Sequence, residues 1–179
     1  LEIQGVKLLS DIDLRLAPGE LVGIVGEVGS GKSLLLQSLV GALGASFRSF
    51  AVDGQVSDGP TDPRVRARLA YVPQEGLTMS AELLENVVFE YAPQGPDVEA
   101  RVRDSLVAAQ CAPEQERLSD GVHTEIGERG VNLSGGQRQR IGLARAHYAQ
   151  RPLILLDDCL SAVDVDTEKK LLDGLIMGR

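Results

Sequence analysis

The stretch GEVGSGKS, Gly26 to Ser33, decides how the rest of this sequence is interpreted. It fits the pattern G-x-x-x-x-G-K-[S/T], and it stands between the apolar run Leu21–Gly26 and a stretch with helical spacing, 32–43. Glycines let successive backbone N–H groups turn toward phosphate oxygens, and a helix beginning near Gly31 adds the positive end of its dipole. The stretch therefore predicts a phosphate-binding loop, with a flexible glycine turn as the alternative.

Two side chains of this loop carry its predicted chemistry. Lys32 is placed to reach the β- and γ-phosphates of a nucleotide, and Ser33 is placed to ligate Mg²⁺. The residues expected to bind the nucleotide here are Gly26, Glu27, Val28, Gly29, Ser30, Gly31, Lys32, Ser33 and Leu34.

Two adjacent acids, Asp157 and Asp158, follow the apolar run Leu153–Leu156. Buried carboxylates are costly unless a cation or hydrogen bonds meet them. In a chain with a phosphate loop, a later strand that ends in an acid is where Mg²⁺ is held, so we expect Asp157 to be a metal ligand through water. A helix-capping acid at the end of a strand is the alternative.

A second glycine-containing helix start is LSGGQ, Leu133 to Gln137. The hydroxyl of Ser134 and the amides of Gly135 and Gly136 can bind an anion, while simple N-capping by Ser134 is the plainer interpretation. Two phosphate-binding helix starts in one chain favour a dimer, in which the second site of each partner closes over the nucleotide of the other.

The pattern between these motifs predicts an α/β fold with a mostly parallel sheet. Residues 6–20 alternate apolar and polar side chains, as a half-buried strand does, and the continuous apolar run Leu21–Gly26 is typical of a fully buried central strand. Short strands and loops are expected at 44–68. The remaining elements expected are strands at 68–74 and 151–158, helices at 32–43, 134–149 and 164–176, and helical structure between 80 and 110, where Asp97 is a candidate cap.

Composition limits the classes of function. The 179 residues suggest one domain, and the 26 acids against 18 bases give a net charge of −8, which argues against a nucleic-acid surface. The two cysteines lack CxxC spacing, so we expect reduced cytoplasmic thiols with no zinc site. The apolar runs are far shorter than the ~20 residues of a membrane-spanning helix. The sequence opens abruptly inside a strand-like pattern and stops abruptly at LIMGR, so we expect a domain truncated at both ends.

Together these motifs resemble those of the nucleotide-binding domain of ATP-binding-cassette (ABC) proteins. GEVGSGKS resembles the Walker A loop, LILLD (Leu153–Asp157) the Walker B strand, and LSGGQRQR (Leu133–Arg140) the ABC signature. The resemblance covers nearly the whole chain. It implies a RecA-like P-loop NTPase core at 1–74 and 140–179, an antiparallel β part, an inserted helical sub-domain at 75–139, and ATP with Mg²⁺ as cofactors.

The resemblance implies further roles and partners. Gln74 matches the Q-loop glutamine, which contacts Mg²⁺ and couples the site to transmembrane domains, and SAVD (Ser161–Asp164) matches the D-loop of the dimer interface. TEIGERG (Thr124–Gly130) is similar to the stretch that meets the coupling helices of ABC exporters. The implied partners are a second nucleotide-binding domain and transmembrane domains, with no nucleic acid, at the cytoplasmic face of a membrane. Taken alone, the three segments are also compatible with a strand end, a capped turn and a solvated loop.

The sequence departs from the family pattern at Asp158, where most ABC ATPases have a glutamate as general base. Asp is one methylene shorter, and a misplacement near 1 Å can cost on the order of 10²-fold in rate. LLDDCLSAVD resembles the first nucleotide-binding domain of C-subfamily exporters, whose own site binds ATP but hydrolyses it slowly. The catalytic residues expected are thus Lys32, Gln74 and a weak base, Asp158. Neutral drift, with Asp158 acting through an added water, is the alternative.

Two other parts of the family pattern have no match. The aromatic residue that stacks on adenine and the switch histidine are expected outside this chain, and we interpret His123 and His147 as structural or surface residues. We therefore predict nucleotide binding with weak or no turnover. Two rival hypotheses are a regulatory module that holds ATP without hydrolysing it and a soluble ABC ATPase without transport function. The acidic balance and TEIGERG weigh against the second.

Overall fold

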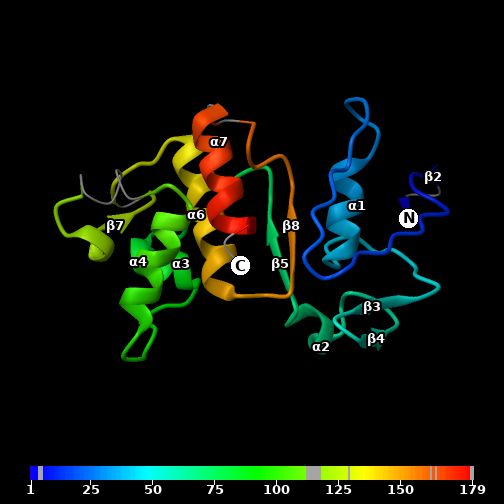
Figure 1. Cartoon of the computed structure of the whole chain (residues 1–179), viewed down its shortest axis with the longest axis horizontal. Coiled ribbons are helices and arrows are strands. Elements are labelled where there is room, and N and C mark those ends of the chain that lie inside the picture. Colours follow the sequence, from blue (N-terminus) through cyan, green and yellow to red (C-terminus); the bar gives the residue numbers. More distant parts are fainter. Residues whose placement is uncertain (4–5, 112–117, 129, 162, 164, 178–179) are drawn as a thin grey trace. The chain divides into compact units, whose positions relative to one another are not determined.

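The computed structural model describes residues 1–3, 6–111, 118–128, 130–161, 163 and 165–177 (Figure 1). The chain divides into two compact units, Leu1–Leu69 and Ala70–Arg179. Among the predicted site segments, Ala162 and Asp164 of SAVD and Arg129 of TEIGERG lie outside the described residues.

The first unit is built from short elements. They are β1 (Glu2–Ile3), β2 (Val6–Lys7), α1 (Lys32–Leu39), β3 (Phe50–Val52), β4 (Gln55–Ser57) and α2 (Pro63–Arg66). The pairs β1–β2 and β3–β4 are antiparallel. A turn at Asp53 and Gly54, both with positive φ, connects β3 to β4, as an Asp-Gly pair favours. The side chain of Asp62 caps α2 by accepting from the Arg64 amide at 2.9 Å. Helix α1 and the short strands at 44–68 are thus confirmed.

Two strands predicted in this unit are wrong. From the alternating stretch 6–20 only Val6 and Lys7 form a strand, and Leu21–Gly26 forms none. The side chains of Leu21 and Val25 are 61% and 92% exposed, so the segment is not a buried central strand. The physical reason is that a strand needs a hydrogen-bonded neighbour. Among the described residues of the first unit, β1 pairs with β2 and β3 pairs with β4, and none of these strands pairs with Leu21–Gly26.

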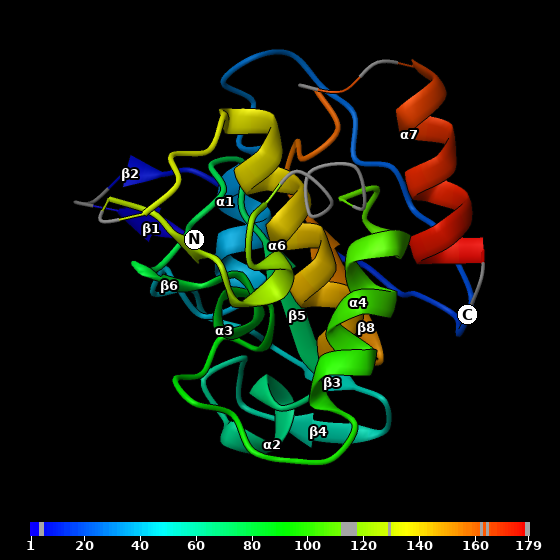
Figure 2. The same cartoon turned by 90° about the vertical axis from the view of Figure 1, so that its left-hand side faces the viewer.

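The second unit carries the longer helices. Its elements are β5 (Leu69–Val72, starting at the boundary), β6 (Ala81–Glu82), α3 (Leu83–Val88), α4 (Val98–Ala108), a 3₁₀ turn η1 (Gly121–His123), β7 (Glu125–Ile126), α6 (Gly135–Ala149), β8 (Leu153–Leu156), α7 (Val165–Leu172) and a π-helical turn η2 (Asp173–Met177). Strand β5 pairs with β8, and β6 pairs antiparallel with β7. Helices α3 and α4 pack against α6 (Figure 2). The strands predicted around β5 and β8 and the helices predicted around α6 and α7 are confirmed.

The hydrophobic core of the second unit joins helices that are far apart in sequence. Val102 and Leu106 of α4, Leu143 of α6 and Leu171 of α7 are at most 1% exposed and belong to one cluster. Each fully buried aliphatic side chain contributes about 1.5–3 kcal/mol. The apolar spacing of α4 and the N-cap position of Asp97 are thereby confirmed, although the Asp97 side chain makes no capping hydrogen bond.

Two further points concern the length of the helices and the division of the chain into sub-domains. Among the described residues, no helix has the length and apolar character needed to cross a bilayer. Helices α3 and α4 share their hydrophobic cluster with α6 and α7. The expected division into 1–74, 75–139 and 140–179 stays a prediction.

Candidate nucleotide-binding site

The phosphate loop of the first unit depends on glycine for its shape. Gly29 and Gly31 have φ angles of 83° and 94°, in the left-handed region that glycine adopts without strain. Gly31 is also the N-cap of α1, and the Gly31 carbonyl accepts a hydrogen bond from the Leu35 amide at 2.9 Å. The loop therefore ends where the positive end of the α1 dipole begins.

Lys32 folds back over this loop. Its Nζ donates to the carbonyl oxygens of Gly26 and Glu27, each at 2.8 Å, and the amide of Ser30 donates to the Glu27 carbonyl at 3.2 Å. The ammonium group is thus held over the loop's own backbone, at the start of α1. Backbone amides, a helix start and a lysine at one place match the chemistry of a polyphosphate, so the residues present fit a nucleotide tail.

In the second unit, Asp157 is a buried carboxylate, 5% exposed, directly after β8. The hydroxyl of Tyr71 donates to its Oδ2 at 3.1 Å, and its own amide donates to the carbonyl of Val72 at 2.9 Å. The pairing of β5 with β8 brings these residues together although Tyr71 lies 86 residues earlier. A carboxylate oxygen is a ligand type that Mg²⁺ prefers, so Asp157 fits its predicted role.

Asp158 is exposed and points toward Gln74. The Gln74 side-chain amide donates to Asp158 Oδ2 at 3.3 Å, across 84 residues of sequence. The backbone of Asp158 has φ 50°, and the Ser161 hydroxyl donates to its carbonyl at 3.0 Å. The structure thus brings together Gln74, Asp157 and Asp158 in the second unit, while Gly26–Leu34 belong to the first.

The start of α6 is a capping box. Ser134 is the N-cap; its hydroxyl accepts from the Gln137 amide at 3.2 Å, and Gln137 Oε1 accepts from the Ser134 amide at 2.8 Å. Gly135 and Gly136 are the first two helical residues. The plainer interpretation of Ser134 as an N-cap is therefore confirmed. Its hydroxyl still has a proton to donate, which leaves its predicted contact with a partner's nucleotide chemically open.

Sequence reasoning missed two side chains of this region. Tyr71, just before Gln74, hydrogen-bonds Asp157, and Gln139 of α6 donates through Nε2 to the Gln74 carbonyl at 2.8 Å. No sequence signal marked Tyr71, because its partner Asp157 lies 86 residues away. Gln139 stood inside the LSGGQRQR motif and could have been assigned only with the helix packing known.

The cysteine beside the acid pair, Cys159, is buried. Burial raises the pKa of the Cys159 thiol to about 11, with the neighbouring Asp158 and Asp157 as smaller causes. The thiol is therefore neutral at pH 7, and Cys111 is a buried free cysteine as well.

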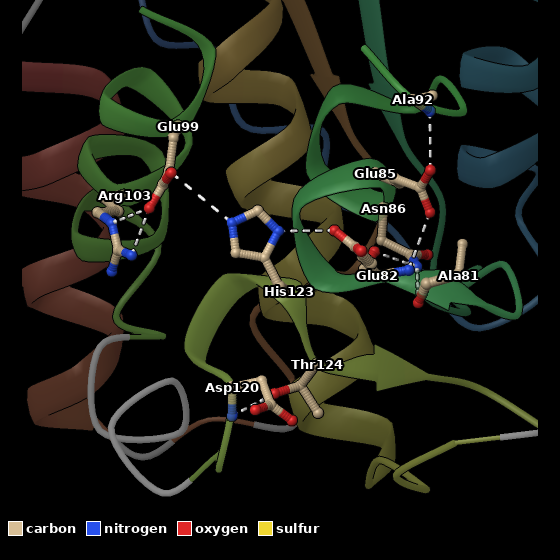
Figure 3. Close-up of polar contacts among 10 residues, drawn as sticks. All are labelled: Ala81, Glu82, Glu85, Asn86, Ala92, Glu99, Arg103, Asp120, His123 and Thr124. Carbon is tan, nitrogen blue, oxygen red and sulfur yellow. Dashed lines mark hydrogen bonds and ion pairs between the residues drawn. The ribbon is translucent and has the colours of Figure 1, made fainter.

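A polar cluster holds the segment that leads into TEIGERG (Figure 3). His123 Nδ1 lies 2.8 Å from Glu82 Oε2, and its Nε2 lies 3.7 Å from Glu99 Oε2, which also pairs with Arg103. The hydrogen bond with Glu82 is the main cause that raises the pKa of His123, while burial acts in the opposite direction. His123 thus acts as a structural residue, joining β6 and α4 next to Thr124.

A cavity of about 410 Å³ lies between the segment after Gln74 and TEIGERG. It is lined by Gly76, Leu77, Thr78, Ser80, Gly127, Glu128, Gly130, Asn132, Leu133 and Arg138. The segment after Gln74 and TEIGERG therefore share one concave surface in the second unit.

Comparison with known proteins identifies the class. The ABC transporter family matches residues 9–161, so this chain belongs to the ABC transporter family. It has the fold of that family's nucleotide-binding domain, a mixed α/β structure with a parallel sheet and antiparallel strands. Among solved structures, the chain is similar to a bacterial Atm1-family ABC exporter with ATP bound, with a TM-score of 0.75 and 32% identity over 88% of this chain and 27% of that one.

The curated relatives refine the resemblance. The chain is 37% identical to human ATP-binding cassette sub-family C member 8 and 40% identical to human sub-family C member 3, over 97% and 94% of its length. It is 35% identical, over 96% of its length, to an ATP-dependent lipid A-core flippase of Cupriavidus metallidurans. It spans 12%, 10% and 29% of these proteins, respectively. The predicted resemblance to ABC exporters and their C subfamily is confirmed.

Proposed function

We propose that this chain is the ATP-binding domain of an export transporter, which pairs with a second nucleotide-binding domain around Mg·ATP at the cytoplasmic face of a membrane. The observation that carries the proposal is the arrangement after β8. Asp157, with a buried carboxylate, and Asp158, with an exposed one, are consecutive residues, and Gln74 reaches Asp158 from 84 residues away. Such long-range convergence of polar groups after a buried strand is what a metal–nucleotide site needs and what a capped turn does not.

Each predicted residue has a definite task in this proposal. Lys32 holds the β- and γ-phosphate charge, while Ser33, Asp157 and Gln74 supply the oxygen ligands for Mg²⁺, which neutralises charge on the phosphates when bound. The start of α6, with Ser134, Gly135 and Gly136, acts on the nucleotide of the partner domain by stabilising negative charge that develops there. These tasks are supported by the loop geometry of the first unit and the carboxylate geometry of the second.

Asp158 is the weak base of a slowly hydrolysing site, as in the first cassette of a C-subfamily exporter. Its carboxylate is exposed and accepts a hydrogen bond from Gln74, which suits a group that orients water. The shorter side chain sets it about one methylene back from the place of a glutamate, which is enough to slow the reaction strongly. In the transporter that carries this chain, Asp158→Glu should raise ATP turnover at this site. Unchanged turnover would favour neutral drift.

The transmembrane partner is proposed to dock over the cavity between Gly76–Ser80 and Gly127–Gly130. The cavity is lined by both loops, and Leu77 beside it has an exposed apolar side chain, 57% accessible, that a partner helix can cover. Because Gln74 precedes this loop directly, pressure from a docked helix reaches the glutamine that contacts the metal.

The first test is calorimetric titration of the folded chain with Mg·ATP and Mg·ADP. We expect one nucleotide per chain, with binding that weakens when Mg²⁺ is chelated. A folded chain that takes up neither nucleotide contradicts the proposal, whatever its relatives do.

A further inference from the structure

Helix α6 holds the segment after Gln74 at two points within the second unit. Near its start, Gln139 Nε2 donates to the Gln74 carbonyl at 2.8 Å. Six residues later, Arg145 Nη2 donates to the Leu77 carbonyl at 3.1 Å. Between them Gly76 lies so close to α6 that a Cβ there would overlap the carbonyl group of Arg138. Residues 74–77 are therefore fixed along the side of α6.

The surroundings of Gln139 indicate a positioning role. Its side chain is 7% exposed, and its Oε1 is buried with no hydrogen-bond partner among the described residues. A carbonyl can only accept, so the amide must turn its NH₂ end to Gln74 and leave the oxygen inside the protein unpaired. A buried unpaired oxygen opposes folding, so an apolar side chain of this size would serve the core as well. What such a side chain cannot supply is the bond to Gln74.

Arg145 anchors the other end of the contact. It also donates through Nε to the Asn86 carbonyl at 3.0 Å, and its guanidinium lies 4.1 Å from the centre of the Phe89 ring. Burial lowers the pKa of Arg145 to about 10, but this value is still well above 7, so the guanidinium is charged at neutral pH. The same side chain thus ties Leu77 and α3 to α6.

We propose that Gln139, with Arg145, clamps residues 74–77 to α6, so that the Gln74 side chain and the Ser134 end of the helix move as one body. Gln139 is a positioning residue because it acts through the backbone of Gln74. This inference rests on the proposed function, in which Gln74 serves the chain's own nucleotide and Ser134 serves the partner's. The clamp then links two nucleotide sites through a single helix.

The test compares Gln139→Met with the matched control Gln94→Met by hydrogen exchange of the full chain. Met keeps the volume of Gln139 but cannot donate, whereas Gln94 is exposed and donates to the nearby Ala92 carbonyl. Without nucleotide, amides 74–78 should exchange about fivefold faster in Gln139→Met, as expected for the loss of one hydrogen bond. The thermal midpoint should stay near that of the wild type, because the unpaired oxygen disappears with the bond.

The second readout measures, by hydrogen exchange, whether nucleotide binding near Gln74 is transmitted to the Ser134 end of α6. When Mg·ATP is added, protection should spread from residues 74–78 to 134–138 in the wild type and in Gln94→Met, and should stop at the first segment in Gln139→Met.

The outcomes separate the two proposals. Unchanged exchange at 74–78 in Gln139→Met, or protection that still spreads to 134–138, overturns the clamp while leaving nucleotide binding intact. A wild-type chain that binds no Mg·ATP overturns the proposed function, and the clamp is then decided by the nucleotide-free exchange alone. If Gln139→Met does not fold, the side chain serves the core, and the positioning role is refuted.

Discussion

The phosphate loop and the acid pair are built in opposite ways. The polar contacts of Lys32 reach carbonyls only five and six residues away, whereas Asp157 and Asp158 are met by side chains 86 and 84 residues away. The apolar residues before the loop are exposed, while Asp157 is buried. One half of the proposed site thus depends on local backbone shape, and the other depends on the packed core of the second unit. Substitutions should therefore affect the two halves differently.

The largest effect is expected from the core of the second unit. Leu106→Ala removes a fully buried side chain and should lower the free energy of unfolding by about 2–5 kcal/mol in urea denaturation. Hydrogen exchange around Gln74 and Asp157 should rise, while exchange at Gly26–Ser33 should not. Val107→Ala, at a neighbouring position that is 57% exposed, is the control and should change stability by less than about 0.5 kcal/mol. Equal loss of protection in both regions contradicts the comparison.

The next effect concerns the phosphate loop alone. Lys32→Ala removes the charge that we propose faces the phosphates, which is expected to weaken Mg·ATP binding by about 2–3 kcal/mol, or about 100-fold, in calorimetry. Its hydrogen bonds are exposed, so the thermal midpoint should barely change. If Lys32→Ala binds Mg·ATP as tightly as the wild type does, the assignment of this loop as a phosphate-binding loop is refuted.

A smaller effect should follow from the buried acid. Asp157→Asn keeps the shape and can still accept from Tyr71, but it removes the charge that favours Mg²⁺. A bond to a charged group contributes about 1.5–3 kcal/mol, so ATP affinity in Mg²⁺ should fall about tenfold or more. Chelation of Mg²⁺ should weaken ATP binding more in the wild type than in Asp157→Asn, which keeps the other proposed ligands, Ser33 and Gln74. A variant that keeps the full response to chelation excludes Asp157 as the metal-linked residue.

The smallest effect is the pH dependence contributed by His123. Its pKa is raised by the hydrogen bond with Glu82, so its contribution to stability is complete below the unfolded value of about 6.5 and is lost as pH rises through the folded value. The imidazole is about half exposed, which limits the effect to less than about 1 kcal/mol. Between pH 6 and pH 8.5, wild-type stability should fall more than that of His123→Gln. Parallel curves for the two proteins contradict the assignment.

Local signals in the sequence predicted what local physics determines. The spacing of Val98, Val102 and Leu106 predicted α4, and Ser134 with its two glycines marked the start of α6. The phosphate loop was recognisable because glycines and a lysine at fixed spacing are needed for its backbone shape. The role of Asp157 could be proposed because an acid that ends an apolar run needs a partner.

What sequence could not predict depends on packing partners. The run Leu21–Gly26 is apolar enough for a buried strand, but apolarity does not supply the neighbouring strand that would pair with it. The bond between Gln139 and Gln74 arises only because α6 lies alongside the segment after β5. Tyr71 is equally invisible, since its contact with Asp157 exists only through the pairing of β5 with β8.

The turn at Asp158 suggests why this acid is short. With φ at 50°, its backbone is in a conformation that Asp and Asn tolerate better than longer side chains, because their short polar groups bond locally. A glutamate placed here must either accept strain of about 1 kcal/mol or straighten the bend that Ser161 now stabilises. The main-chain shape at this position therefore favours the shorter acid, so Asp158→Glu should gain reach toward a water molecule at the cost of about 1 kcal/mol of stability.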